Sequence, residues 1–177
     1  MGDVQSNNSM NMAISGRAPD RLRWATRPLL ALLAVLIVAA CARPPEEVAY
    51  ARGGGTSWEN LEGQWLLINY WAEWCAPCRV EIPELNELHE LGRDFGIMVL
   101  GVNFDGIVGE PLIEVMDRMD VQFPVLLHDP RARWNLPLPS VLPSTLVINP
   151  AGELHDVLVG PQTLESLSEA VEFVPQL

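Results

Sequence analysis

The chain has 177 residues, enough for one domain with additional segments, and nearly half of its residues are apolar. All 11 of its cationic residues are arginine, they face 23 Asp and Glu residues, and the net charge is −12. Binding to nucleic acid and adhesion to anionic membranes through a basic patch both need cationic surface, so this balance argues against both functions.

The first 40 residues have the pattern of a secretory signal peptide. Arginines are the cations of residues 1–27, and an apolar run of 13 residues follows at 28–40. A membrane-spanning helix needs about 20 apolar residues, so this run is short for one. A basic segment followed by a short apolar run and small residues predicts a signal that is removed on export.

Cys41 follows the apolar run directly, in the stretch Val38-Ala-Ala-Cys41. This stretch closely resembles a bacterial lipobox, in which the cysteine becomes the lipid-modified first residue of the mature protein. The resemblance implies a lipid anchor at Cys41 and a location on the periplasmic side of a bacterial membrane. The alternative is an uncleaved membrane anchor in which the cysteine has no role.

A proline- and glycine-rich stretch separates the leader from the rest of the chain. Residues 41–57 contain Pro44-Pro45 and three consecutive glycines at 53–55, which predicts a flexible tether. We therefore expect one compact domain over residues 58–177.

Apolar segments of strand and helix character alternate through this domain. A strand of almost wholly apolar residues is expected where both faces of a sheet are covered, and a stripe of apolar residues about three apart predicts a helix. The predicted elements are strand 66–71, helix 78–91, strand 97–102, a helix beginning near Pro111, strand 123–127, a hairpin of strands 144–148 and 153–159, and a last helix capped by Thr163. The alternation predicts an α/β domain with a parallel sheet and an antiparallel edge.

Cys75 and Cys78 lie where the first predicted strand meets the first helix, in the sequence Trp74-Cys-Ala-Pro-Cys78. The amides of a helix start stabilise a thiolate, so Cys75 is the predicted nucleophile, and Cys78, one turn further, is predicted to be more buried and to resolve a mixed disulfide. Ala76 and Pro77 are predicted to tune the redox potential, because proline stiffens the turn and removes one amide. Trp74 offers a flat apolar surface beside the pair.

Two structural roles compete with redox chemistry at this pair. A structural zinc site needs four ligands, and the three histidines of the chain are scattered without ligand spacing. A purely structural disulfide between these positions would close a very short loop and stabilise little. We therefore predict a redox pair that needs no metal or other cofactor.

The stretch Asn69–Leu85 carries the signature Trp-Cys-x-Pro-Cys-Arg-x-Glu-x-Pro-x-Leu. It resembles thioredoxin-like proteins of the TlpA/ResA group, which also resemble the CcmG/DsbE cytochrome-maturation proteins, and the resemblance covers about residues 58–177. It implies a thioredoxin-like α/β fold, a central mixed sheet flanked by helices, with a helix-strand insertion at about residues 105–127. It also implies a membrane-tethered reductant of exported proteins, and several members of the group serve cytochrome c assembly.

The resemblance also assigns residues around the cysteines. Leu142 and Pro143 match the cis-proline loop that faces the pair, where a backbone turned toward the client would bind an extended segment of it. Glu81 matches an acidic residue near the disulfide, and its spacing from Cys78 places both on one helical face, where Glu81 could relay a proton. Asn69 occupies the position of a buried acid in thioredoxins, and because asparagine does not titrate, proton handling shifts toward Glu81 or water.

We therefore expect an exported, lipid-anchored, monomeric thiol–disulfide oxidoreductase that reduces client proteins carrying a disulfide or a Cys-x-x-Cys motif. A membrane thiol reductase would return its electrons, because the bacterial periplasm is kept oxidising. Three alternatives remain open at this point: a thiol oxidase or disulfide isomerase, a Cu(I) carrier that uses Cys75 and Cys78 as soft ligands, and a scaffold with a vestigial disulfide.

Overall fold

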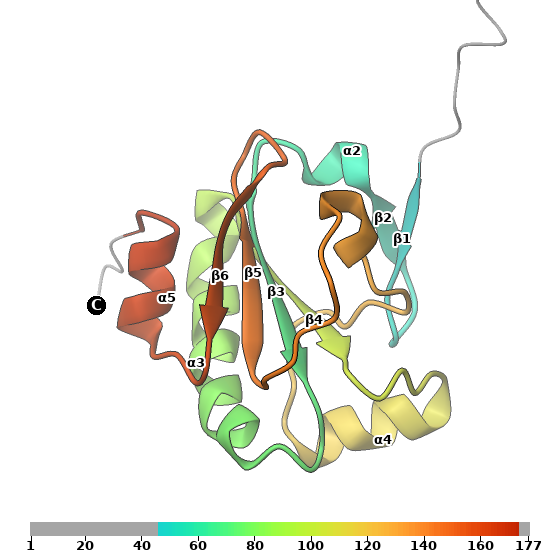
Figure 1. Cartoon of the computed structure of the whole chain (residues 1–177). Coiled ribbons are helices and arrows are strands. Elements are labelled where there is room, and N and C mark those ends of the chain that lie inside the picture. Colours follow the sequence, from blue (N-terminus) through green and yellow to red (C-terminus); the bar gives the residue numbers. More distant parts are fainter. Residues whose placement is uncertain (1–45, 174–177) are drawn as a thin grey trace, which may run out of the picture. The chain divides into compact units, whose positions relative to one another are not determined.

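The structure is a computed structural model that describes residues 46–173, and its centre is a four-stranded mixed sheet (Figure 1). The strands lie in the order β4-β3-β5-β6, with β3 parallel to β4 and antiparallel to β5, and β5 antiparallel to β6. Their bounds are β3 Trp65–Trp71, β4 Ile97–Asn103, β5 Ser144–Ile148 and β6 Leu154–Val159. The thioredoxin-like α/β fold with a mixed sheet flanked by helices is therefore confirmed.

The central strand β3 is covered on both faces, as its almost continuous apolar sequence predicts. Leu67 and Trp71 lie in one apolar cluster, and Ile68 and Tyr70 lie in the other, because successive side chains of a strand point to opposite faces. All four side chains are fully buried. The sheet thus separates two apolar layers, and β3 leads directly into the cysteine pair.

Helix α3 (Ala76–Gly92) connects β3 to β4, and α5 (Leu164–Ala170) packs beside it on the same face of the sheet (Figure 1). The predicted apolar stripe of α3 is confirmed at Ile82, Leu85 and Leu88, which are buried. It is wrong at Val80, which the spacing also places on the stripe but which is 69% exposed. Thr163 caps α5 through its side chain, as the sequence predicts. Helix α3 begins at Ala76, two residues earlier than predicted, and this places Cys75 at its N-cap.

The prediction of a flexible tether is wrong for the part of it that the structure describes. Strand β1 (Glu47–Ala49) pairs antiparallel with β2 (Gly55–Ser57), and the turn between them uses positive φ at Gly53 and Gly54. Val48 is buried in the apolar cluster on the sheet face away from α3. The compact unit begins at Pro45 and not at residue 58, because this hairpin packs on the sheet, and the short helix α2 (Trp58–Leu61) follows it.

The helix predicted in the insertion is confirmed as α4 (Glu110–Arg118). Its inner face, formed by Leu112, Val115 and Met116, is buried. The predicted strand 123–127 is wrong as a regular strand. Only single bridges form there, from Val125 to Gly101 of β4 and from Leu126 to Tyr50, because Pro124 has no N–H to donate to a ladder.

Gly101 explains how this segment approaches β4 so closely. A Cβ at this position would lie 2.9 Å from atoms of Phe123, Trp71 and Val125, which is shorter than a normal contact. The absence of a side chain therefore lets residues 123–125 cover the outer edge of β4, where the Gly101 N–H donates to the Pro124 carbonyl at 2.8 Å.

The opposite edge of the sheet is β6, whose side chains are mostly exposed. Val157 and Val159 are exposed apolar residues on this strand, and the neighbouring Asp156 accepts a hydrogen bond from the Val157 backbone N–H at 2.7 Å. Two shorter 3-10 turns complete the elements, Arg93–Phe95 and Arg131–Trp134.

Candidate active site

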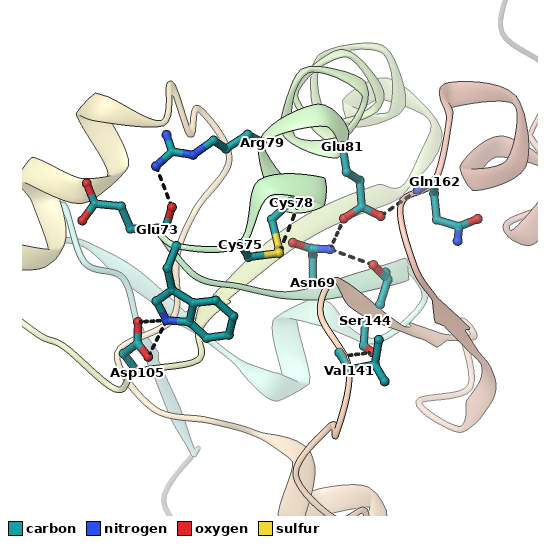
Figure 2. Close-up of a disulfide and its surroundings, with 12 residues drawn as sticks. Asn69, Glu73, Cys75, Cys78, Arg79, Glu81, Asp105, Val141, Ser144 and Gln162 are labelled. Carbon is teal, nitrogen blue, oxygen red and sulfur yellow. Dashed lines mark hydrogen bonds between the residues drawn. A yellow bond between two sulfur atoms is a disulfide. The ribbon is translucent and has the colours of Figure 1, made fainter.

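Cys75 and Cys78 form a disulfide at the start of α3, with an S–S distance of 1.98 Å and Cα atoms 5.3 Å apart (Figure 2). The Cys75 sulfur accepts a hydrogen bond from the Cys78 backbone N–H at 3.2 Å. Cys75 is 4% exposed, whereas Cys78 is completely buried. The sulfur that sits at the helix N-cap is therefore also the one that an incoming molecule can reach first, which confirms the predicted difference in burial.

The loop that holds Cys75 is fixed from two sides. The Arg79 guanidinium donates to the Glu73 carbonyl at 2.6 Å (Figure 2). The Glu73 carboxylate pairs with Arg118 of α4 at 2.7 Å. Ala76 and Pro77, in the first turn of α3, are exposed next to the sulfurs. Their effect on the redox potential stays a prediction.

Trp74 lies beside the pair and is 64% exposed. Its indole N–H donates to both carboxylate oxygens of Asp105 at 3.1 Å, and its ring packs edge to face on Phe104. Trp74 is a predicted site residue, whereas its partner Asp105, from the loop after β4, was not predicted. The indole is therefore held in one orientation as an exposed apolar surface, which supports its predicted role in client binding.

Behind the disulfide lies a fully buried polar group centred on Glu81 of α3. One carboxylate oxygen, Oε2, accepts from Asn69 Nδ2 at 2.8 Å, and the other, Oε1, accepts from the Gln162 backbone N–H at 3.2 Å (Figure 2). Asn69 Nδ2 also donates to the Thr145 hydroxyl oxygen at 2.9 Å. The two predicted site residues Asn69 and Glu81 are thus in direct contact, whereas Thr145 and Gln162 were not predicted.

Burial dominates the electrostatics of Glu81. It raises the pKa of this carboxyl from an ordinary value of 4.5 to about 7, and the hydrogen bonds from Asn69 and the Gln162 backbone oppose the rise. A carboxyl with a pKa near neutrality can both take up and release a proton, which is what general acid–base catalysis requires.

The Leu142–Pro143 peptide bond is cis, as the sequence resemblance implies for this loop. The loop precedes β5, and the Ser144 hydroxyl donates to the Val141 carbonyl at 2.8 Å, which ties the two sides of the turn together. Ser144 and Val141 lie on the side of the disulfide opposite α3 in Figure 2. Leu142 packs against the apolar cluster that contains Cys75 and Cys78, and the role of Leu142 and Pro143 in client binding stays a prediction.

The sequence profile of the AhpC/TSA family matches residues 44–157, which is more than half of the chain and includes both cysteines. The chain belongs to the AhpC/TSA family. Among curated relatives, it is 30% identical over 118 residues to the thiol-disulfide oxidoreductase ResA of Geobacillus kaustophilus, covering 65% of this chain and 66% of that protein. It is 33% identical over 110 residues to the ResA of Oceanobacillus iheyensis, covering 61% and 56%.

Among solved structures, this family member is similar to a thioredoxin-family thiol:disulfide interchange protein from Chlorobium tepidum. The TM-score is 0.61 at 24% identity, covering 74% of this chain and 96% of the other. This likeness shows the shared fold. The matched region spans just under two thirds of the first ResA relative and 56% of the second.

An apolar groove of about 260 Å³ adjoins the cis-proline loop of this AhpC/TSA family member. It is lined by residues 136–141 together with Ser144 and Leu146 of β5 and Val157 and Val159 of β6. Leu138 and Val141 are exposed apolar residues at its surface. The groove shares Val141 and Ser144 with the cis-proline loop, so the two surfaces are adjacent.

Within residues 46–173, no group of three or more His, Cys, Asp or Glu side chains is placed to hold a metal ion. In the same part of the chain, no helix is long and apolar enough to cross a membrane. The predicted signal peptide and the predicted lipidation site Cys41 lie outside the described residues.

Proposed function

We propose that this protein is an exported thiol–disulfide oxidoreductase that reduces disulfides in client proteins. The observation that carries the proposal is the asymmetric cysteine pair, with Cys75 at the N-cap of α3 and Cys78 buried behind it. Its similarity to proteins named thiol-disulfide oxidoreductase ResA supports the same chemistry. Its clients would be exported proteins with a disulfide or an oxidised Cys-x-x-Cys motif, of which apocytochrome c is one by family analogy.

The proposed reaction has two exchange steps. The reduced Cys75 thiolate attacks a client disulfide, a Cys75–client bond forms, the client S–S bond breaks, and the departing client sulfur takes a proton. Cys78 then attacks the Cys75 sulfur while its proton passes to Glu81, and the second client sulfur leaves and is protonated. Two electrons pass to the client, and the protein is left with its Cys75–Cys78 disulfide. A membrane thiol reductase would return the two electrons.

An extended client segment would bind along the cis-proline loop, Trp74 and the groove that adjoins this loop. The cis-proline loop presents backbone groups for hydrogen bonds, and Trp74 and the groove lined by residues 136–141 present apolar side chains.

The direction of electron flow is decided by the redox potential of the pair. An equilibrium titration of the full chain against glutathione or dithiothreitol is expected to give a value near the thioredoxin potential of about −270 mV. The Cys75→Ser variant is the control, since it has no dithiol to oxidise. A potential near the DsbA value of about −120 mV would reject the reductant in favour of a thiol oxidase.

We further propose that residues 1–40 are removed and that Cys41 carries the lipid that tethers the protein to the periplasmic side of a bacterial membrane. The sequence Val38-Ala-Ala-Cys41 after a short apolar run supports this proposal. Cells that express the full chain and are fed labelled palmitate are expected to label it, and the Cys41→Ser variant is expected to lose all label. Cys75→Ser is the matched control and should keep the label; retention of label by Cys41→Ser would refute the lipid anchor.

A further inference from the structure

The side-chain amide of Asn69 makes two hydrogen bonds through its nitrogen and none through its oxygen within the described residues. Its nitrogen, Nδ2, donates to Glu81 at 2.8 Å and to Thr145 at 2.9 Å. Its oxygen, Oδ1, is buried and has no hydrogen-bond partner among residues 46–173. A buried carbonyl without a partner is costly, so this arrangement calls for a physical reason.

The Gln162 backbone decides where a proton can sit on Glu81. A backbone N–H can only donate, so the oxygen that faces Gln162, Oε1, must remain an acceptor in both protonation states. The carbonyl oxygen of a carboxylic acid is a better acceptor than its hydroxyl oxygen, so a proton taken up by Glu81 is placed on Oε2, the oxygen that faces Asn69. Protonated Glu81 then presents an O–H to the Asn69 amide nitrogen, which cannot accept a hydrogen bond.

Rotation of the amide by half a turn resolves this conflict. Oδ1 then takes the position of Nδ2 and accepts from the Glu81 O–H, and the separation of 2.8 Å is normal for such a bond. The Thr145 hydroxyl tolerates both orientations, because it accepts from Nδ2 in one and donates to Oδ1 in the other. The contacts of Asn69 with Glu81 and with Thr145 can thus form both with Glu81 ionised and with Glu81 protonated.

We infer that the Asn69 carboxamide is a two-position switch that turns when Glu81 takes up the proton of Cys78, and in doing so points its N–H₂ toward the active-site sulfurs. In Figure 2 the oxygen end of Asn69, which the nitrogen would replace, points toward the disulfide. The inference rests on the proposed function for the step in which Cys78 loses its proton. Asn69 is a positioning residue in this step, because the proton moves between Cys78 and Glu81.

The step balances in atoms and charge. The Cys78 S–H bond breaks and the Glu81 O–H bond forms, so a neutral thiol and a carboxylate become a thiolate and a carboxylic acid. The turned Asn69 accepts from the new O–H and directs its N–H₂ toward the thiolate, which then attacks the Cys75 sulfur.

The groups around Glu81 let this proton transfer occur near neutral pH. Neighbouring strands present uncharged Asn69 and Thr145, and the segment before α5 presents the Gln162 backbone. On α3, the titratable groups one turn from Glu81 are Cys78, when reduced, and Glu84, which accepts from the Leu164 backbone N–H at 2.8 Å. The raised pKa of Glu81, caused by burial, is consistent with a proton that is easily gained and lost.

Nuclear Overhauser contacts of the Asn69 side-chain N–H₂ test the switch in the oxidised full chain labelled with ¹⁵N at asparagine. At about pH 9, where Glu81 is ionised, strong contacts to the Thr145 side chain are expected. At about pH 5 these should fall several-fold, and contacts to the Cys78 Hβ protons should replace them. Asn86 is the internal control, since both ends of its amide are bonded, to the Asp120 carbonyl and the Gln122 N–H, and its contacts should not change.

Glu81→Gln provides a second arm that does not depend on titration. Its carbonyl must face the Gln162 N–H, so its N–H₂ faces Asn69 and imitates the protonated acid. The variant is expected to show the low-pH contacts of Asn69 at both pH values. If Asn69 keeps its Thr145 contacts in this variant, or at both pH values in the wild type, the switch is refuted. Failure of the wild type to reduce disulfides would instead reject the proposed function and leave these contacts unaffected.

Discussion

Replacing Cys75 with serine is expected to lower the rate of client-disulfide reduction by several orders of magnitude, the scale of losing a catalytic nucleophile. Serine keeps the size and the N-cap hydrogen bond of the side chain, but at neutral pH it supplies no anionic nucleophile to attack a disulfide. Insulin reduction with dithiothreitol as the electron source measures this loss. A lipoprotein scaffold with a vestigial disulfide predicts no change in phenotype, so a fully active Cys75→Ser variant would contradict the proposed mechanism.

Cys78→Ser has a different expected result because Cys78 acts second. Cys75 can still attack the client, but without the buried thiol the mixed disulfide is not resolved and accumulates. Non-reducing electrophoresis followed by mass spectrometry should find the client joined to Cys75. The matched control is the double variant Cys75→Ser/Cys78→Ser, which should trap nothing. Trapping by the double variant would mean that another cysteine carries the exchange.

Replacing Glu81 with glutamine is expected to change the stability of the oxidised protein in a pH-dependent way. Compared with the wild type, the variant should become more stable as the pH rises. The folded pKa of about 7 lies above the ordinary value of 4.5, so the folded state binds this proton more tightly than the unfolded state does. The stability that Glu81 contributes is therefore full below pH 4.5 and is lost as the pH rises to about 7. This separation corresponds to about 3 kcal/mol of unfolding free energy.

Urea unfolding of the wild type and Glu81→Gln at several pH values measures this effect. The difference in unfolding free energy should change by about 3 kcal/mol in favour of the variant across that window. Glu87→Gln, an exposed position on the same helix, is the control and should stay within about 0.5 kcal/mol of the wild type. A Glu81→Gln difference that is constant with pH would show that the buried carboxyl does not titrate in this range.

The local features of the site could be predicted from the sequence because they depend on neighbours along the chain. The strand before Cys75, the helix after it and the greater burial of Cys78 all follow from a short segment. The spacing of Cys78 and Glu81 likewise places both on one helical face.

The rest of the site depends on contacts between distant segments, which local patterns do not encode. Thr145 and Gln162 lie 76 and 81 residues from their partners Asn69 and Glu81, and they meet only through strand pairing and the packing of α5. Asp105, which accepts the hydrogen bond from Trp74, is likewise distant from its partner in the sequence. A resemblance to a known family pointed to the cis-proline loop, whose cis bond no periodicity could indicate.

The two incorrect predictions, the flexible tether and the strand at 123–127, concern sequences that fit more than one local structure. Glycines at 53–55 are as suitable for a flexible linker as for a tight turn, and only the burial of Val48 shows which is formed. Around Val125 the apolar sequence fits a strand, but Pro124 limits the pairing to single bridges.

The edge strand β6 has a consequence for the behaviour of the protein at high concentration. An open strand edge with exposed valines invites a strand of another molecule to add to it, which is a route to aggregation. Here the Asp156 carboxylate already occupies the Val157 N–H, and its negative charge stands where an incoming strand would have to lose its water. This contact makes the strand that lines the groove a poorer template for sheet extension, although its valines stay exposed.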